Sequence, residues 1–120
     1  MRPHEKLDVW TRAVDFVVLV YKLTESFPKE EKFGLTSQIR RAAVSVPANI
    51  AEGAARDSSK EFAHFLSNAQ GSASELATEL LIAFRLGLLS DSDYRRTQLE
   101  LDHIGRMIHG LSQHAKSKRE

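Results

Sequence analysis

Apolar residues recur at three- and four-residue steps along four stretches of the chain, a spacing that places them on one face of an α-helix. The predicted helices cover about residues 7–26, 35–56, 59–86 and 91–114, and short links join them. No stretch alternates apolar and polar residues as a half-buried strand does. The pattern therefore predicts an all-α fold, an up-down-up-down antiparallel four-helix bundle that forms one domain over residues 1–120.

Local signals mark where two of these helices begin and end. Ser58 followed by Glu61 has the spacing of a capping box, and Ser90 with Asp93 marks the start of the fourth helix. Gly87 supplies a stop signal between the third and fourth helices. Residues 115–120 are almost entirely polar or charged, so we expect a disordered C-terminal tail.

The second helix, residues 35–56, is the most apolar of the four around its circumference. One arc carries leucine, isoleucine and valine, and the next arc is mostly alanine. The apolar sector of the first helix is also wider than one partner needs. Because these two faces exceed what a four-helix core can hide, we expect a closed homo-oligomer. Gly71, in the middle of the third helix, predicts close approach to another helix.

Composition narrows the function classes. The chain has no cysteine, which excludes disulfides and thiolate chemistry. Seventeen Lys and Arg against sixteen Asp and Glu leave a net charge of +1, which is not the footprint of a dedicated nucleic-acid binder. The longest apolar run, residues 16–21, is too short to cross a bilayer, and the N-terminus lacks the apolar core of a signal peptide. We expect a soluble, cytoplasmic protein with no membrane partner.

The sequence also resembles a known family. The segments LTSQIRRAA (residues 35–43) and SVPANIAEG (residues 45–53), followed by Gly71-Ser72, Glu75-Leu76 and Glu79-Leu80, resemble the four-helix-bundle family named after proteins encoded in intervening sequences of bacterial 23S ribosomal RNA genes. The resemblance runs from Leu7 to about Leu89. It implies a bacterial protein that forms a ring of five subunits, a homopentamer, with no established biochemical activity.

That family is in turn similar to the accessory variability determinant of diversity-generating retroelements. The relative is a pentameric bundle that binds nucleic acid and its reverse transcriptase. The resemblance therefore implies RNA or DNA, or a protein partner such as a nucleic-acid enzyme, as candidate partners.

A polar stripe runs along the second helix and allows two interpretations. Helical spacing places Gln38, Arg41, Ser45, Asn49, Glu52 and Arg56 within one arc. In the first interpretation, Arg41, Asn49 and Glu52 form a hydrogen-bonded structural network with Glu75 or Glu79 of the third helix. In the second, the stripe lines a groove or ring lumen that binds a ligand or an RNA backbone. The first interpretation is favoured, because buried polar groups must be paired, and the second and third helices together offer both the cationic and the acidic partners.

Two Glu-x-x-His spacings resemble the ligand pairs of di-iron bundles. They are Glu61 with His64 and Glu100 with His103. Both histidines point well away from the apolar stripes of their helices, so we expect surface pairs and no metal site. No serine lies on a nucleophile elbow with a histidine nearby. We therefore predict no catalytic residues, no cofactor and no enzyme activity.

The remaining candidates are cations that could contact phosphate. They are Arg40, Arg56, Arg95, Arg96, Arg106 and Lys116. Ordinary solvated charge is the alternative, because acidic residues are interleaved with those of the fourth helix. Two function classes follow: an oligomeric accessory module that binds nucleic acid weakly and without sequence preference, and a protein–protein interaction scaffold with no nucleic-acid role.

Overall fold

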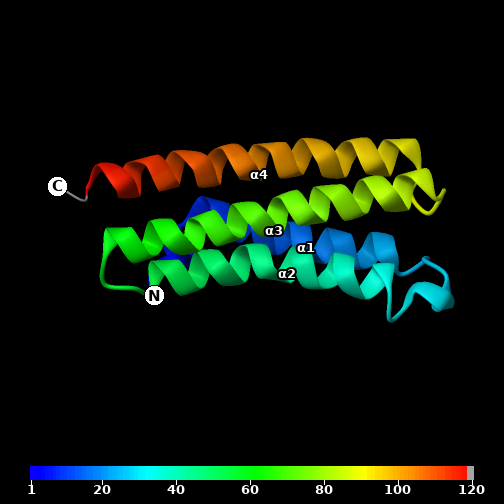
Figure 1. The fold of residues 1–120 in the computed structure, drawn as a ribbon, viewed down its shortest axis with the longest axis horizontal. Helices are drawn as coiled ribbons and strands as arrows, with labels where there is room; N and C mark the ends of the chain where they lie inside the picture. Colours follow the sequence, from blue (N-terminus) through cyan, green and yellow to red (C-terminus); the bar gives the residue numbers. More distant parts are fainter. Residues whose placement is uncertain (119–120) are drawn as a thin grey trace.

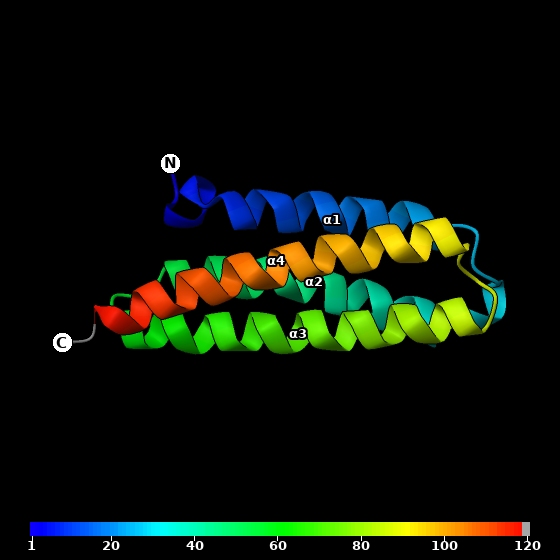
Figure 2. The same cartoon turned by 90° about the horizontal axis from the view of Figure 1, so that it is seen from above.

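The computed structural model describes residues 1–118. The protein is an elongated bundle measuring 49 × 22 × 21 Å. Its long helices are α1 (Asp8–Thr24), α2 (Leu35–Ala54), α3 (Ser59–Arg85) and α4 (Asp91–Ser117). Short 3-10 helices lie at Pro3–Lys6 and Lys29–Glu31. The four long helices run antiparallel to their neighbours in chain order (Figures 1 and 2). The predicted all-α four-helix bundle is confirmed.

The apolar stripes of the four helices meet in one core. α2 packs most extensively against α3, whereas α1 and α4 contact each other least among neighbouring helices. Figure 2 shows α1 and α3 on opposite sides of the bundle, with α2 and α4 between them. The largest fully buried side chains are Val20, Ile39, Ile50, Leu66, Leu76, Leu80, Thr97, Ile104 and Ile108.

Two of the four glycines inside helices show how uneven the packing is. A Cβ atom added to Gly53 of α2 would lie 2.7 Å from the Cβ atom of Phe65, so α3 approaches this position closely. A Cβ atom added to Gly71 of α3 would meet no atom within 4 Å. The prediction that Gly71 permits close approach of another helix is therefore wrong within one chain.

The predicted helix starts are made by the expected side chains. The Ser58 hydroxyl accepts a hydrogen bond from the Glu61 backbone N–H at 3.1 Å, and the Ser90 hydroxyl accepts one from that of Asp93 at 3.1 Å. Gly87 has a φ angle of 80°, a left-handed conformation that suits glycine just beyond a helix end.

The C-terminus differs from the prediction. α4 continues to Ser117, and Ala115 is buried, so residues 115–117 are not a disordered tail. Ala115 follows the buried Ile104 and Ile108 at helical spacing and keeps the apolar face of α4 in register. Residues 119–120 of the predicted tail lie outside the described residues. Over residues 1–118, no helix combines the length and apolarity needed to cross a membrane.

Candidate functional site

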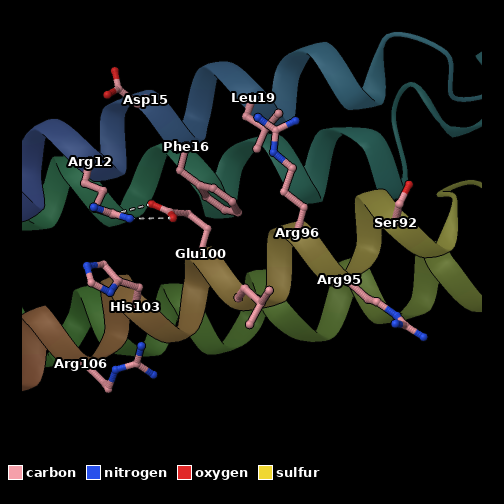
Figure 3. Close-up of a pocket in the computed structure, with 11 residues that line it drawn as sticks. Arg12, Asp15, Phe16, Leu19, Ser92, Arg95, Arg96, Glu100, His103 and Arg106 are labelled. Carbon is pink, nitrogen blue, oxygen red and sulfur yellow. Dashed lines mark hydrogen bonds and ion pairs between the residues drawn. The ribbon is translucent and has the colours of Figure 1, made fainter.

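The loose packing of α1 against α4 leaves a groove of about 880 Å³ between them. We call it the basic groove. α1 and α4 supply all eleven lining residues, which are Arg12, Asp15, Phe16, Leu19, Ser92, Arg95, Arg96, Leu99, Glu100, His103 and Arg106. Most of the α4 residues recur at three- and four-residue steps, so one continuous face of α4 forms one wall. Figure 3 shows how these side chains lie.

One ion pair bridges the two walls of the basic groove. The Nε atom of Arg12 lies 2.7 Å from one carboxylate oxygen of Glu100, and its Nη2 atom lies 3.2 Å from the other. This two-point geometry holds a guanidinium more firmly than a single contact does. The hydrogen bond to Glu100 raises the pKa of Arg12. Arg12 therefore fastens α1 to α4 and keeps its positive charge.

The other arginines of the groove differ in how they are held. Arg95 pairs with Asp91 at 2.9 Å one turn earlier on α4. Arg96 extends from α4 toward Leu19 of α1, whereas Arg95 points away from α1 (Figure 3). Within residues 1–118, neither Arg96 nor Arg106 makes an ion pair. The α4 wall thus presents two cations to solvent beside the exposed Leu99.

The remaining predicted phosphate contacts lie elsewhere. Arg40 of α2 donates to the Thr24 hydroxyl at 2.9 Å and covers the Tyr21 ring at 4.5 Å, so it fastens α2 to α1. Arg56 pairs with Glu52 at 2.9 Å and lies over the Phe65 ring at 4.7 Å.

Lys116 is exposed on the last turn of α4. The structure therefore brings together only three of the six predicted cations, Arg95, Arg96 and Arg106.

Part of the predicted α2 network exists, but it takes a shorter form. Ser45 and Ser72 hydroxyls share a hydrogen bond of 2.8 Å across the α2–α3 seam. The Asn49 side-chain amide donates to the Ser45 carbonyl at 2.9 Å and to its hydroxyl at 3.0 Å. Of the predicted members on α2, only Ser45 makes a side-chain hydrogen bond to α3.

The predicted link from α2 to the carboxylates of α3 is not made within one chain. Gln38, Arg41 and Glu75 are exposed, and no ion pair in the described residues joins Arg41 to Glu75 or Glu79. Glu52 pairs instead with Arg56, which lies just beyond the end of α2. Long side chains on neighbouring helices can share an arc and still remain beyond the 4 Å that an ion pair needs.

Glu79 is the unusual member of this set. It is only 8% exposed, and its Oε1 atom is buried without a hydrogen-bond partner. Burial, with the negative charge of Glu75 as a second cause, raises the pKa of Glu79 above its ordinary value. A buried carboxyl group without a cation is costly, so Glu79 marks a place where one chain leaves a polar group unsatisfied.

The two Glu-x-x-His pairs do not face each other. His64 is exposed and packs edge-on against Phe65, while His103 lines the basic groove. Glu100 is committed to Arg12. No group of three or more His, Asp or Glu side chains within residues 1–118 is arranged to hold a metal ion.

Sequence reasoning missed the groove itself. Arg12 is not among the predicted site residues, because its partner Glu100 lies 88 positions away and no local signal connects the two. Leu99, which is 70% exposed between the arginines of α4, was not singled out either. The sequence did offer one signal for Leu99, because helical spacing places it on the same face of the fourth helix as several arginines.

Chemically, the basic groove offers cations above an apolar floor. Phe16 and Leu19 supply part of that floor from α1. Arginine and a neutral or protonated imidazole can donate hydrogen bonds to phosphate oxygens, which suits an anionic chain better than a neutral ligand.

Comparisons with known proteins agree on the family and the fold. A sequence profile described as 23S rRNA-intervening sequence protein matches residues 5–110. A solved structure from Bacteroides thetaiotaomicron VPI-5482, described as a protein with unknown function from the S23 ribosomal protein family, is similar with a TM-score of 0.78. The two sequences are 22% identical, and the match covers 87% of this chain and 97% of that one, which supports a shared fold. A comparison with curated proteins gave no match.

Proposed function

We propose that this chain, which belongs to the 23S rRNA-intervening sequence protein family, is a non-enzymatic accessory module that self-assembles and binds nucleic acid weakly and without sequence preference. The observation that carries the binding proposal is the α4 wall of the basic groove, where Arg96 and Arg106 make no ion pair within the described residues. We place the protein in the cytoplasm, where RNA and DNA of a bacterial cell are present.

The charge pattern supports contact with phosphate and argues against base recognition. Arginines on one helix face can follow a backbone, and such contacts carry no sequence information by themselves. Phe16 is the one Phe, Tyr or Trp side chain among the groove residues, and it is buried, so it offers no stacking surface for a base. Binding should therefore be in the micromolar range or weaker, and it should decline steeply with salt.

Self-assembly is supported by apolar side chains that one chain leaves exposed. Phe33 is 90% exposed, and Val18, Tyr21 and Val44 expose about half of their surface or somewhat less. These residues lie on α1, on α2 and in the link between the two, where one chain leaves them uncovered. A homopentamer is the assembly that the family resemblance implies. Light scattering should give a multiple of the 13.5 kDa chain mass.

Fluorescence anisotropy with labelled RNA and DNA at low salt tests the binding proposal. We expect the double variant Arg96→Glu/Arg106→Glu to weaken binding at least tenfold and to lower the slope of log affinity against log salt by about one per lost phosphate contact. The matched control is Lys60→Glu/Arg85→Glu, which changes the net charge equally but lies on α3, away from the groove. The control should retain most of the affinity.

A protein scaffold with no nucleic-acid role is the second candidate, favoured by Leu99, which is exposed within the groove. If neither RNA nor DNA binds at tens of micromolar protein in low salt, the nucleic-acid proposal is wrong and the scaffold takes its place. Equal weakening by both double variants would also reject the groove as the binding surface, since net charge alone would then explain the effect.

A further inference from the structure

A second hollow lies between the end of α1 and the first half of α2. Its volume is about 640 Å³, and its lining residues are Tyr21, Lys32, Phe33, Thr36, Ser37, Arg40, Arg41, Val44 and Ser45. We call it the cationic hollow, because three of these residues carry a positive charge and none is acidic. Arg40 is already committed to Thr24 and Tyr21. Lys32 and Arg41 have no carboxylate partner within residues 1–118.

A surface of opposite character runs along α3. Glu75, Glu79, Ile82 and Leu86 follow one another at four- and three-residue steps, which places them on one face of the helix. We call this face the acidic stripe. Leu86 is 60% exposed and Ile82 is 44% exposed, whereas Glu79 is buried with one oxygen unpartnered. The stripe thus combines unpaired acids with uncovered apolar side chains.

Each of the two surfaces lacks the charged groups that the other supplies. The cationic hollow has charges without carboxylates and exposes Phe33 and Val44, while the acidic stripe has carboxylates without cations. Within residues 1–118, no ion pair joins Arg41 or Lys32 to the acids of α3, so both surfaces leave charges unpaired. Complementary charge with apolar contact at the centre is the composition expected of a specific protein interface.

We propose that the acidic stripe of one copy docks into the cationic hollow of a second copy. This inference rests on the self-assembly part of the proposed function and names the surfaces that make the contact. Arg41 of one copy then faces Glu75 of its neighbour. Ile82 and Leu86 cover the exposed apolar residues of the hollow.

The placement of the two surfaces also determines the kind of assembly. The hollow is lined by residues of α1, of α2 and of the link between them, and the stripe lies on α3, which packs against α2. A contact between two different surfaces is head-to-tail, and each added copy turns by the same angle. Such a contact closes into a ring when the rotation between copies completes a full turn, and otherwise continues as an open filament.

Charge reversal tests the pairing. We expect Glu75→Lys and Arg41→Glu each to shift the assembly to the chain mass of 13.5 kDa in light scattering at micromolar concentration. The double variant Glu75→Lys/Arg41→Glu should restore the assembly, because every contact is again between opposite charges. Asp102→Lys is the matched control for Glu75→Lys, since it is exposed on α4 outside both surfaces, and it should keep the assembled mass.

Circular dichroism and thermal melting separate a lost fold from a lost contact. All the substituted residues are exposed, so helix content should be unchanged in each variant. If the unmodified chain is itself a monomer, the self-assembly part of the proposed function fails, and this inference fails with it. If the chain assembles and both single variants keep the assembled mass, or if the double variant stays monomeric, this inference is overturned while self-assembly stands.

Two other results would also reject the inference. If Arg41 and Glu75 act on each other within one chain, their variants lower the melting temperature without changing the mass. If the hollow receives a different protein, the unmodified chain stays monomeric until that protein is added.

Discussion

The contact between Gly53 of α2 and the start of α3 gives the sharpest prediction about stability. A Cβ atom at this position would lie 2.7 Å from the Cβ atom of Phe65 and 3.0 Å from the Cδ1 atom of Phe62. It would also lie 3.3 Å from the Phe62 carbonyl oxygen. The nearest atom, the Phe65 Cβ, is fixed to the backbone of α3, so a change of rotamer cannot relieve this contact. Gly53→Ala must therefore push α2 away from α3.

The magnitude follows from two opposing terms. Alanine stabilises a helix interior by about 1 kcal/mol relative to glycine. Overpacking a close contact typically costs about 1–3 kcal/mol, and the upper end applies here because carbon atoms normally approach only to about 3.5–4.0 Å. We expect a net loss of about 2 kcal/mol in the free energy of unfolding. For a chain of this size, the melting temperature should fall by roughly 8 °C.

Thermal and urea unfolding followed by circular dichroism measure this loss. Gly110→Ala is the matched control, because Gly110 is exposed inside α4 and a Cβ atom there would meet no atom within 4 Å. The control should gain up to about 1 kcal/mol from helix propensity alone. If Gly53→Ala were as stabilising as Gly110→Ala, the close approach of α2 to α3 described above would be incorrect.

Two further predictions concern the acids of α2 and α3, each measured on protein diluted to the single chain. Glu52→Ala should lower stability by only about 0.3–0.5 kcal/mol in urea unfolding, because the Glu52–Arg56 pair is exposed; a loss above 1 kcal/mol would show that Glu52 has a buried partner. Glu79→Leu should raise stability at pH 7 by about 1–3 kcal/mol, since it removes a buried carboxylate without a partner. Folding raises the pKa of Glu79, so the native chain loses stability as the pH rises from the ordinary value of 4.5 through the raised value. The advantage of Glu79→Leu should therefore shrink as the pH falls toward 4.5, and a constant advantage across thermal melts from pH 4 to 8 would contradict this reasoning.

The fold could be predicted because its causes are local. A helix face needs only the spacing of apolar residues, and a cap needs only a serine three positions before a free backbone N–H. Both signals lie within a few residues of the structure they specify, as Ser58 and Ser90 illustrate. The end of α4 was predicted wrongly because alanine carries little hydrophobic signal. Ala115 still fits the buried face, and its small side chain suits a tightly packed position.

The site could be predicted only in part because its contacts are not local. A helical wheel gives the direction of a side chain from its own axis, but it does not fix which neighbour that direction meets. Helical spacing places the predicted polar stripe on one arc, yet within residues 1–118 Arg41 makes no ion pair with Glu75, while Ser45 reaches Ser72. A hydrogen bond between two short side chains, such as Ser45 and Ser72, forms only where the two helices lie close together. Long side chains can reach several partners, and Glu52 pairs with Arg56, four positions later in the chain.

Net charge was the least informative of the sequence observations, because it averages over surfaces that differ in sign. The +1 total conceals the cationic hollow, the acidic stripe and the α4 wall of the basic groove. Docking of the stripe into the hollow would neutralise these two surfaces against each other and leave Arg96 and Arg106 exposed on every copy. The assembly would then expose one basic groove per copy, while the acidic stripe of each copy would be covered by its neighbour. A long nucleic acid could contact several grooves at once. The two proposals are therefore linked: a single chain of nearly zero charge is a poor ligand for phosphate, and a ring of such chains is a better one.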